Sequence, residues 1–234
     1  MKNIGVLVAV EISAVLEKYK DKLREEKHAL FSVYALQKEN ATLYFVHSGA
    51  GEIRAAAAVQ LLVDKYDIDL LINFGVVGAL TKDFESVQTC FAKRVVHYDF
   101  DTSAADDCEI GRYNDYPEVF LHTSADILEK ASRLFPDIPL VTIASGDKFI
   151  ADEAQKQKLH EDFSADICDM ESAAVVLISD MNSVPNLLIK TVADSVTGGA
   201  AEFRARFSEG AEIALKIADD FCNQNSMLFL KDKV

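Results

Sequence analysis

Two carboxylates in the last third of the sequence, Glu171 and Asp194, stand where chemistry is commonly done. Glu171 lies in the run DMESA at 169–173, directly before a predicted helix, and Asp194 ends the largely apolar segment 186–193. In open α/β sheets ligands bind at the carboxyl ends of strands. Two acids delivered there can do separate work, one binding a sugar and one moving a proton. Each also has a plainer interpretation, as a helix-start acid for Glu171 and as a cap or turn residue for Asp194.

Three further junctions between a predicted strand and a loop are rich in small residues. The turn SGAG at 48–51 opens an Ala-rich helix, and bare backbone N–H groups at such a helix start can approach an anion or a sugar oxygen. A plain tight turn is the alternative, and the glycine pattern is too short for a dinucleotide fingerprint. Similar turns are expected at 73–80 and 145–150. Since all these turns follow strands, we expect one composite pocket.

The elements that must position these turns alternate between strand and helix nearly throughout. Apolar runs predict strands at 3–10, 31–36, 42–46, 68–75, 87–98, 119–123, 140–144, 167–170 and 186–193. Helical periodicity predicts helices at 11–23, 52–66, 124–135, 152–160, 172–181 and 202–225. The alternation predicts an α/β fold, a mixed central sheet flanked by helices in three layers. Residues 99–117 are expected to form a long irregular loop.

The composition predicts one soluble domain over residues 1–234. Half of the residues are hydrophobic, enough for a sizeable core, and no linker or repeat divides the chain. The net charge of −14 argues against a nucleic-acid partner, since a phosphate backbone requires a basic surface. The apolar stretches are far shorter than the roughly 20 residues that cross a bilayer. The residues at 1–5 enter an apolar strand directly, with no small-residue cleavage site behind them, so no signal peptide is expected. We expect a cytoplasmic protein, without a membrane partner, that binds a small molecule or another protein.

Neither the cysteines nor the acids suggest a metal site. Cys90, Cys108, Cys168 and Cys222 lie far apart, with no Cys-x-x-Cys pair. Acids and histidines are likewise spread without ligand spacing. We expect reduced, mostly buried thiols, no metal and no cofactor.

The order of the motifs resembles that of a known family. SGxG at 48–51, NxGxxG at 73–78, SGDxFI at 145–150, DMESA at 169–173 and the pair AD at 193–194 follow one another as in the purine nucleoside phosphorylase superfamily. Within it, spacing and chain length look most like the 5'-methylthioadenosine/S-adenosylhomocysteine nucleosidases. The resemblance covers nearly the whole chain. It implies a nucleoside phosphorylase-like fold, a homodimer and a place in methionine salvage.

The resemblance also implies roles for individual residues. Glu171 would accept hydrogen bonds from the ribose hydroxyls, with Met170 packed against the sugar. Asp194 would donate a proton to N7 of the departing purine, Phe149 would stack on the base, and the backbone of Ile150 would read its edge. These roles suit the reaction, because cleavage of an N-glycosidic bond develops positive charge on the sugar and negative charge on the base.

Other residues are expected at the substrate on weaker grounds. Ser48, Gly75 and Gly78 belong to the small-residue turns, and Phe203 is a candidate for the wall at the 5' end, although core packing is its plainer interpretation. Neither the purine nor the 5' substituent can be named from the sequence.

The departures from the family pattern concern the site for water or phosphate. The nucleosidases carry a water-activating glutamate after the first strand, and alignment from Gly5 places Ser13 there, with Glu11 two residues earlier. Serine is a poor general base without a partner, while Glu11 is as well explained as a helix-start acid. Val76 stands where the family has serine, and Lys190 where the nucleosidases have arginine. The other proton carriers to consider are His47, His97 and His122.

Three functions remain open from the sequence. The first is an N-ribosyl hydrolase acting on a purine nucleoside, with 5'-methylthioadenosine and S-adenosylhomocysteine as candidates. The second is a phosphorylase, which would need an anion site; Val76 weakens that case, although Lys190 and Arg54 are available as cations. The third is a catalytically weakened nucleoside-binding protein, which would keep the sugar and base contacts without a water activator.

Overall fold

Strand β1 (Lys2–Val8) shows why the chain forms layers. Its last five residues are buried, and they alternate between two apolar clusters: Leu7 belongs to one, Val6 and Val8 to the other. Because successive side chains of a strand point to opposite faces, a strand that is apolar on both faces needs cover on both. The computed structural model, which describes residues 2–84 and 87–225, provides that cover with helices.

The secondary structure of the described residues follows the expected alternation. The remaining strands are β2 (Leu23–His28), β3 (Phe31–Gln37), β4 (Ala41–His47), β5 (Leu70–Ala79), β6 (Thr89–His97), β7 (Phe120–His122), β8 (Leu140–Ser145), β9 (Ile167–Asp169) and β10 (Asn186–Asp194). The α-helices are α1 (Ile12–Tyr19), α2 (Glu52–Tyr66), α3 (Ala125–Leu134), α4 (Glu153–Phe163), α5 (Ser172–Met181) and α6 (Ala200–Asn225). Short 3₁₀ turns lie at Lys20–Lys22 and Lys82–Phe84.

The ten strands within the described residues belong to one mixed sheet. Its order is β10-β6-β8-β9-β5-β1-β4-β3-β2, with β7 paired to β6. Since β10 also pairs with β5, the strands β5, β10, β6, β8 and β9 form a closed ring of pairings. The ring brings the carboxyl ends of β1, β5 and β10 near the start of α5, which follows β9. The fold therefore gathers segments from the whole chain.

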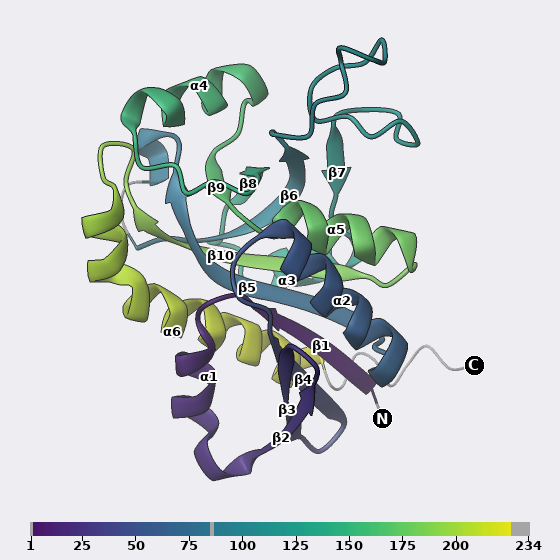
Figure 1. Ribbon diagram of the computed structural model, residues 1–234. Coiled ribbons are helices and arrows are strands. Elements are labelled where there is room, and N and C mark those ends of the chain that lie inside the picture. Colours follow the sequence, from purple (N-terminus) through teal and green to yellow (C-terminus); the bar gives the residue numbers. More distant parts are fainter. Residues whose placement is uncertain (1, 85–86, 226–234) are drawn as a thin grey trace.

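Helices cover the sheet on both sides, as expected for three layers (Figure 1). Helices α2 and α5 pack on one face, in the cluster that contains Leu7 and Leu71. Helices α1, α3 and α6 pack on the other, with Val6 and Ile72. Helix α4 packs against the rest of the protein through Leu159, which belongs to a smaller apolar cluster. The predicted α/β class is confirmed.

Two local expectations were wrong. The helix predicted at 11–23 ends at Tyr19, and Leu23–His28 is an edge strand paired with β3. Its sequence LREEKH carries charges on both faces, so neither apolar alternation nor β-propensity signals a strand. The small-residue turn predicted at 73–80 is instead the second half of β5. Glycines there leave space for neighbouring side chains within a continuous strand.

Two further observations concern the helices and the cysteines of the part of the chain that the structure describes. No helix in the described ranges is both long and apolar enough to cross a membrane. The four cysteines are unpaired, and Cys108 alone among them is not fully buried.

Candidate active site

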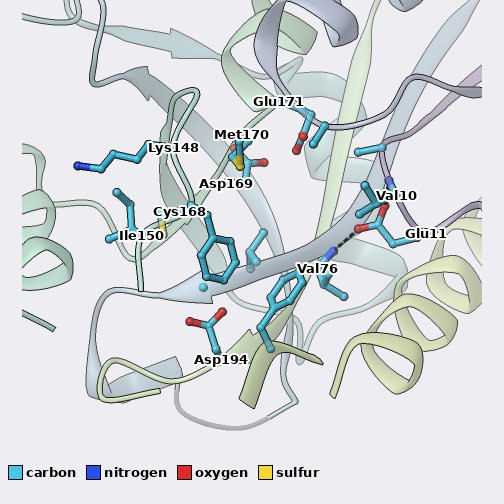
Figure 2. A pocket seen from close by; sticks show the side chains of 16 residues that line it. Val10, Glu11, Val76, Lys148, Ile150, Cys168, Asp169, Met170, Glu171 and Asp194 are labelled. Atoms are coloured by element: carbon cyan, nitrogen blue, oxygen red, sulfur yellow. Dashed lines mark hydrogen bonds between the residues drawn. The ribbon is translucent and has the colours of Figure 1, made fainter. Parts of the chain in front are cut away.

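A cavity of about 200 Å³ opens where β1, β5, β9 and β10 end (Figure 2). Most of the residues singled out in the sequence line it. They are Glu11, Val76, Gly78, Phe149, Ile150, Met170, Glu171, Phe203 and Asp194. The expected composite pocket is therefore present. Four carboxylates line it, those of Glu11, Asp169, Glu171 and Asp194.

Glu11 lies between β1 and α1, and its carboxylate turns back toward β5. One oxygen accepts a hydrogen bond from the backbone N–H of Val76 at 2.9 Å and the other from that of Val10 at 3.0 Å. A Cβ on Gly75 would lie 2.8 Å from Glu11 Oε1, so the absence of a side chain there makes room for the carboxylate. Glu11 is 2% exposed, and burial raises the pKa of its carboxyl.

Ser13 lies elsewhere. It is exposed on α1 and does not line the cavity. The side chain that lines the cavity is that of Glu11, which lies between the end of β1 at Val8 and the start of α1 at Ile12. None of His47, His97 and His122 lines the cavity either. Among the residues considered for activating water, the structure places Glu11 in the cavity.

Glu171 occupies the N-terminal end of α5, across the cavity from Asp194 (Figure 2). Its Oε1 accepts a hydrogen bond from the backbone N–H of Gly51 at 2.9 Å, so the turn at 48–51 holds this side chain. Burial, followed by the negative charge of Asp169, raises the pKa of Glu171 to about 8. The carboxyl is thus held mainly in its protonated form at neutral pH and ionises as the pH rises through about 8.

Asp194 ends β10 beside Gly78 of β5. The two residues are paired in the sheet register, which shifts between Val192 and Asp194. Such an irregularity re-aims a side chain at a strand end, and Asp194 lines the cavity. Its Oδ2 forms an ion pair with the buried Lys156 of α4. Burial raises the pKa of Asp194, while the hydrogen bond and charge of Lys156 act in the opposite direction.

The side of the cavity near Asp194 is apolar and aromatic. The ring of Phe149 meets that of Phe203 edge to face, with centroids 5.2 Å apart. Phe149 is 43% exposed, so this wall is open to solvent. Ile150 and Met170 complete it. A flat aromatic ligand and a sugar edge would both find apolar contacts here.

Lys190, Ser48 and Gly75 support the cavity without lining it. Lys190 is buried, forms an ion pair with Asp169 at 2.8 Å, and donates a hydrogen bond to Asn73 at 2.5 Å. Its charge lowers the pKa of both Glu11 and Glu171, against the stronger effect of burial. Ser48 is buried within the turn at 48–51, and it is Ala50 of this turn that lines the cavity.

Two residues, one in the cavity wall and one behind it, were not singled out from the sequence as site residues. Asp169 lines the cavity, accepts hydrogen bonds from Ser145 and Ser172, and forms an ion pair with Lys190. Its place in the DMESA run indicates that it lies near Glu171, but not that it pairs with Lys190. Lys156 lies in a helix whose other residues are mostly exposed and polar, so no sequence signal marks it as buried.

Fold and site together define an α/β enzyme with a carboxylate-lined cavity at its strand ends. The family model described as the phosphorylase superfamily matches residues 3–223. An aminodeoxyfutalosine nucleosidase of Campylobacter jejuni is 32% identical, over 94% of this chain and 96% of its own. A 5'-methylthioadenosine/S-adenosylhomocysteine nucleosidase of Staphylococcus aureus is 28% identical, over 90% and 94%. The chain belongs to the phosphorylase superfamily.

The fold agrees with this membership. The solved structure of a futalosine hydrolase mutant of Helicobacter pylori superimposes with a TM-score of 0.90. The match covers 96% of this chain and 100% of that one, at 22% sequence identity. The resemblance recognised in the motifs is thereby confirmed at the level of the family and the fold.

Proposed function

We propose that this protein is an N-ribosyl hydrolase that cleaves the glycosidic bond of a purine nucleoside. The observation that carries the proposal is the convergence of Glu11, Glu171 and Asp194 on one cavity. Hydrolysis of an N-glycosidic bond requires stabilisation of a cationic sugar, a proton for the departing base and an activated water. Three carboxylates in separate environments can meet these three requirements. The nucleosidase names of the two relatives above support the same chemistry.

Glu171 is the proposed sugar ligand. Its carboxylate lies beside Met170, and the hydrogen bond from Gly51 leaves Oε2 available to the ribose hydroxyls. When ionised, it also stabilises the positive charge that develops at C1'. The raised pKa means that ribose binding, which favours the ionised form, is coupled to release of a proton.

Asp194 is the proposed general acid at N7 of the purine. Burial favours its protonated form, which is the form that can donate. Phe149 would stack on the base, and the backbone of Ile150 would read its edge. Phe203, edge-on to Phe149, closes the aromatic wall toward the 5' substituent.

Glu11 is the proposed general base for water. Two backbone N–H groups fix its carboxylate, and its raised pKa brings it closer to the working pH of a base. The position of Glu11 also argues against the two alternative functions, a nucleoside binder and a phosphorylase. A nucleoside binder without turnover would lack a water activator, and a phosphorylase would have to place an anion beside this buried acid. Hydrolysis is therefore favoured over both.

The relatives' names suggest which nucleosides to test first. Methylthioadenosine, S-adenosylhomocysteine and aminodeoxyfutalosine differ in the 5' substituent, and adenosine and inosine supply unsubstituted controls. Release of free base should proceed without phosphate and fall by about 10²–10⁴-fold in Asp194→Asn, because the base loses its proton donor. Release only with phosphate would make the protein a phosphorylase, and tight binding without release would leave a binder.

We also infer that the protein is a cytoplasmic homodimer acting in methionine salvage. The family resemblance supports the dimer and the pathway, and four unpaired cysteines suit a reducing compartment. Ile53 is 80% exposed on α2, two residues after the turn that holds Glu171. An apolar side chain so placed is suited to contact a second subunit next to the cavity.

A further inference from the structure

Lys156 is a buried cation for which the chemistry described so far has no use. It lies on α4, and its side chain is fully inaccessible to solvent. Its ammonium group forms the ion pair with Asp194 Oδ2 and donates to the backbone carbonyls of Ser195 at 2.5 Å and Gly198 at 3.2 Å. These contacts use all three of its N–H donors. A buried lysine is costly unless it is fully paired, so its place is closely specified.

The contacts of Lys156 join two parts of the cavity wall. Helix α4 begins three residues after Ile150, on the segment that carries the aromatic wall, and Asp152 caps it by accepting a hydrogen bond from the N–H of Gln155. The segment 194–198 begins with Asp194, which lines the cavity. Glu202 holds Ser195 from the other side, through a backbone bond of 3.1 Å and a hydroxyl bond of 2.8 Å.

Among the charged groups around Asp194, Lys156 is the one that stabilises its ionised carboxylate. The other titratable groups that face it are Cys168 on β9, whose pKa burial and Asp194 raise, and Glu202 on α6, which raises the pKa of Asp194. Lys156 binds Oδ2, and both carboxylate oxygens lie against Gly78, since a Cβ there would be 3.2 Å from Oδ1 and 3.3 Å from Oδ2. Gly78 and Asp194 both line the cavity, so the carboxyl group that Lys156 holds faces the ligand side.

We infer that Lys156 is a positioning residue that sets the direction and the acid strength of the Asp194 carboxyl. This inference rests on the proposed function. In the step, the proton on Asp194 passes to N7, the C1'–N9 bond breaks with its electron pair going to the base, and Asp194 is left as a carboxylate. Water adds to C1' and gives its proton to Glu11. Exchange with solvent then returns a proton to Asp194 and removes the one on Glu11. Lys156 keeps its protons and stabilises the carboxylate that the transfer leaves behind.

Lys156→Met tests this with Lys158→Met as the matched control. Lys158 lies on the same helix but is exposed, in an ion pair with Asp162. We expect Lys156→Met to lower kcat for base release by about tenfold or more with little change in KM, since the acid and not the binding surface is affected. The alkaline limb of the kcat–pH profile should move to higher pH, because the cation that lowers the pKa of Asp194 is gone. Lys158→Met should match wild type in both respects.

A double variant covers the case in which Lys156→Met leaves Asp194 as an unpaired buried charge and does not fold. Lys156→Met combined with Asp194→Asn removes both charges, which buried sites tolerate better than the loss of one partner. Single-turnover base release with enzyme in excess should be within about twofold of Asp194→Asn alone, because the lysine acts through the carboxylate.

The outcomes separate this inference from the proposed function. Base release by wild type together with an unshifted pH profile in Lys156→Met would overturn the role of Lys156 and leave the hydrolase intact. A further tenfold loss in the double variant relative to Asp194→Asn would also overturn it, since Lys156 would then act elsewhere. Absence of base release by wild type from every nucleoside in the panel would overturn both.

Discussion

At the scale of single residues, three carboxylates acquire different properties from their surroundings. Glu11 has two backbone donors, Glu171 has one donor and a neighbouring negative charge, and Asp194 has a lysine. Burial raises the pKa of all three. One side-chain chemistry can thus serve base, sugar ligand and acid, because the environment and not the carboxyl group itself sets the role.

The first prediction separates Glu11 from Ser13. Glu11→Gln preserves the volume of the side chain but removes the base, so kcat for hydrolysis should fall by about 10²–10⁴-fold. Ser13→Ala changes an exposed helix position outside the cavity and should leave kcat within about twofold. Steady-state base release measures both. Equal losses in the two variants would contradict the placement of Glu11 as the base.

The second prediction concerns pH and stability. The folded-state pKa of Glu171 is about 8, against an ordinary 4.5, so the folded protein binds more protons than the unfolded chain between these values. The contribution of Glu171 is therefore fully present below pH 4.5 and is lost as pH rises through 8. Glu52, with a pKa of about 7, acts in the same direction.

Thermal unfolding of the ligand-free protein between pH 6 and 9 measures this effect. Wild type should lose more stability over the range than Glu171→Gln, which has no proton to lose at this position. A Glu171→Gln variant whose melting temperature falls as steeply as that of wild type would show that the folded protein holds Glu171 ionised.

At the scale of elements, the second half of β5 controls the positions of two acids. Gly75 makes room for Glu11, and Gly78 is paired with Asp194. Strand β5 therefore determines where the carboxylates of Glu11 and Asp194 can lie. Small residues in a central strand, which weaken it locally, here allow side chains from β10 and from the segment after β1 to approach the backbone.

The third prediction follows from Gly75. A Cβ at this position would come within 2.8 Å of Glu11 Oε1, so Gly75→Ala should displace the carboxylate and reduce kcat by about tenfold or more. In a Glu11→Gln background the same substitution should cost little further activity. Additive losses across this cycle, measured by single-turnover base release, would show that Gly75 acts independently of Glu11.

The sequence predicted most elements and the set of strand ends that form the site, because apolar periodicity and the position after a strand are local signals. It missed β2, whose charged residues are placed by pairing with β3, and it took the glycines of β5 for a turn. It also left Glu11 and Ser13 undecided, because counting from a strand start does not fix which side chain turns inward. The burial of Lys156 depends on a loop 39 residues away in sequence, as its bond to Ser195 shows, and no local pattern encodes it.

At the scale of the whole molecule, Ile53 is a large apolar side chain that is 80% exposed on α2, and the fourth prediction concerns association. If α2 contacts a second subunit, Ile53→Asp should weaken the dimer by about tenfold or more, because it buries an unpaired charge in an interface core. Leu30→Asp is the control: Leu30 is 81% exposed, much like Ile53 at 80%, but it lies at the tip of the β2–β3 hairpin.

Sedimentation of both variants and wild type at a series of concentrations provides the measurement. A dimer in wild type and Leu30→Asp, with monomer in Ile53→Asp, would support the interface on α2. A wild-type monomer at micromolar concentration would remove the dimer, and equal effects of the two substitutions would place the contact away from Ile53.

The central position of β10 has a consequence for synthesis. This strand comes late in the chain, yet it lies between β5 and β6, which have been made long before. Until β10 emerges from the ribosome, those two strands present open edges that other chains could pair with. The last acid of the site arrives on the same strand. A nascent or truncated chain would therefore be both aggregation-prone and inactive, and the protein should depend on protection by chaperones until its final segments are released.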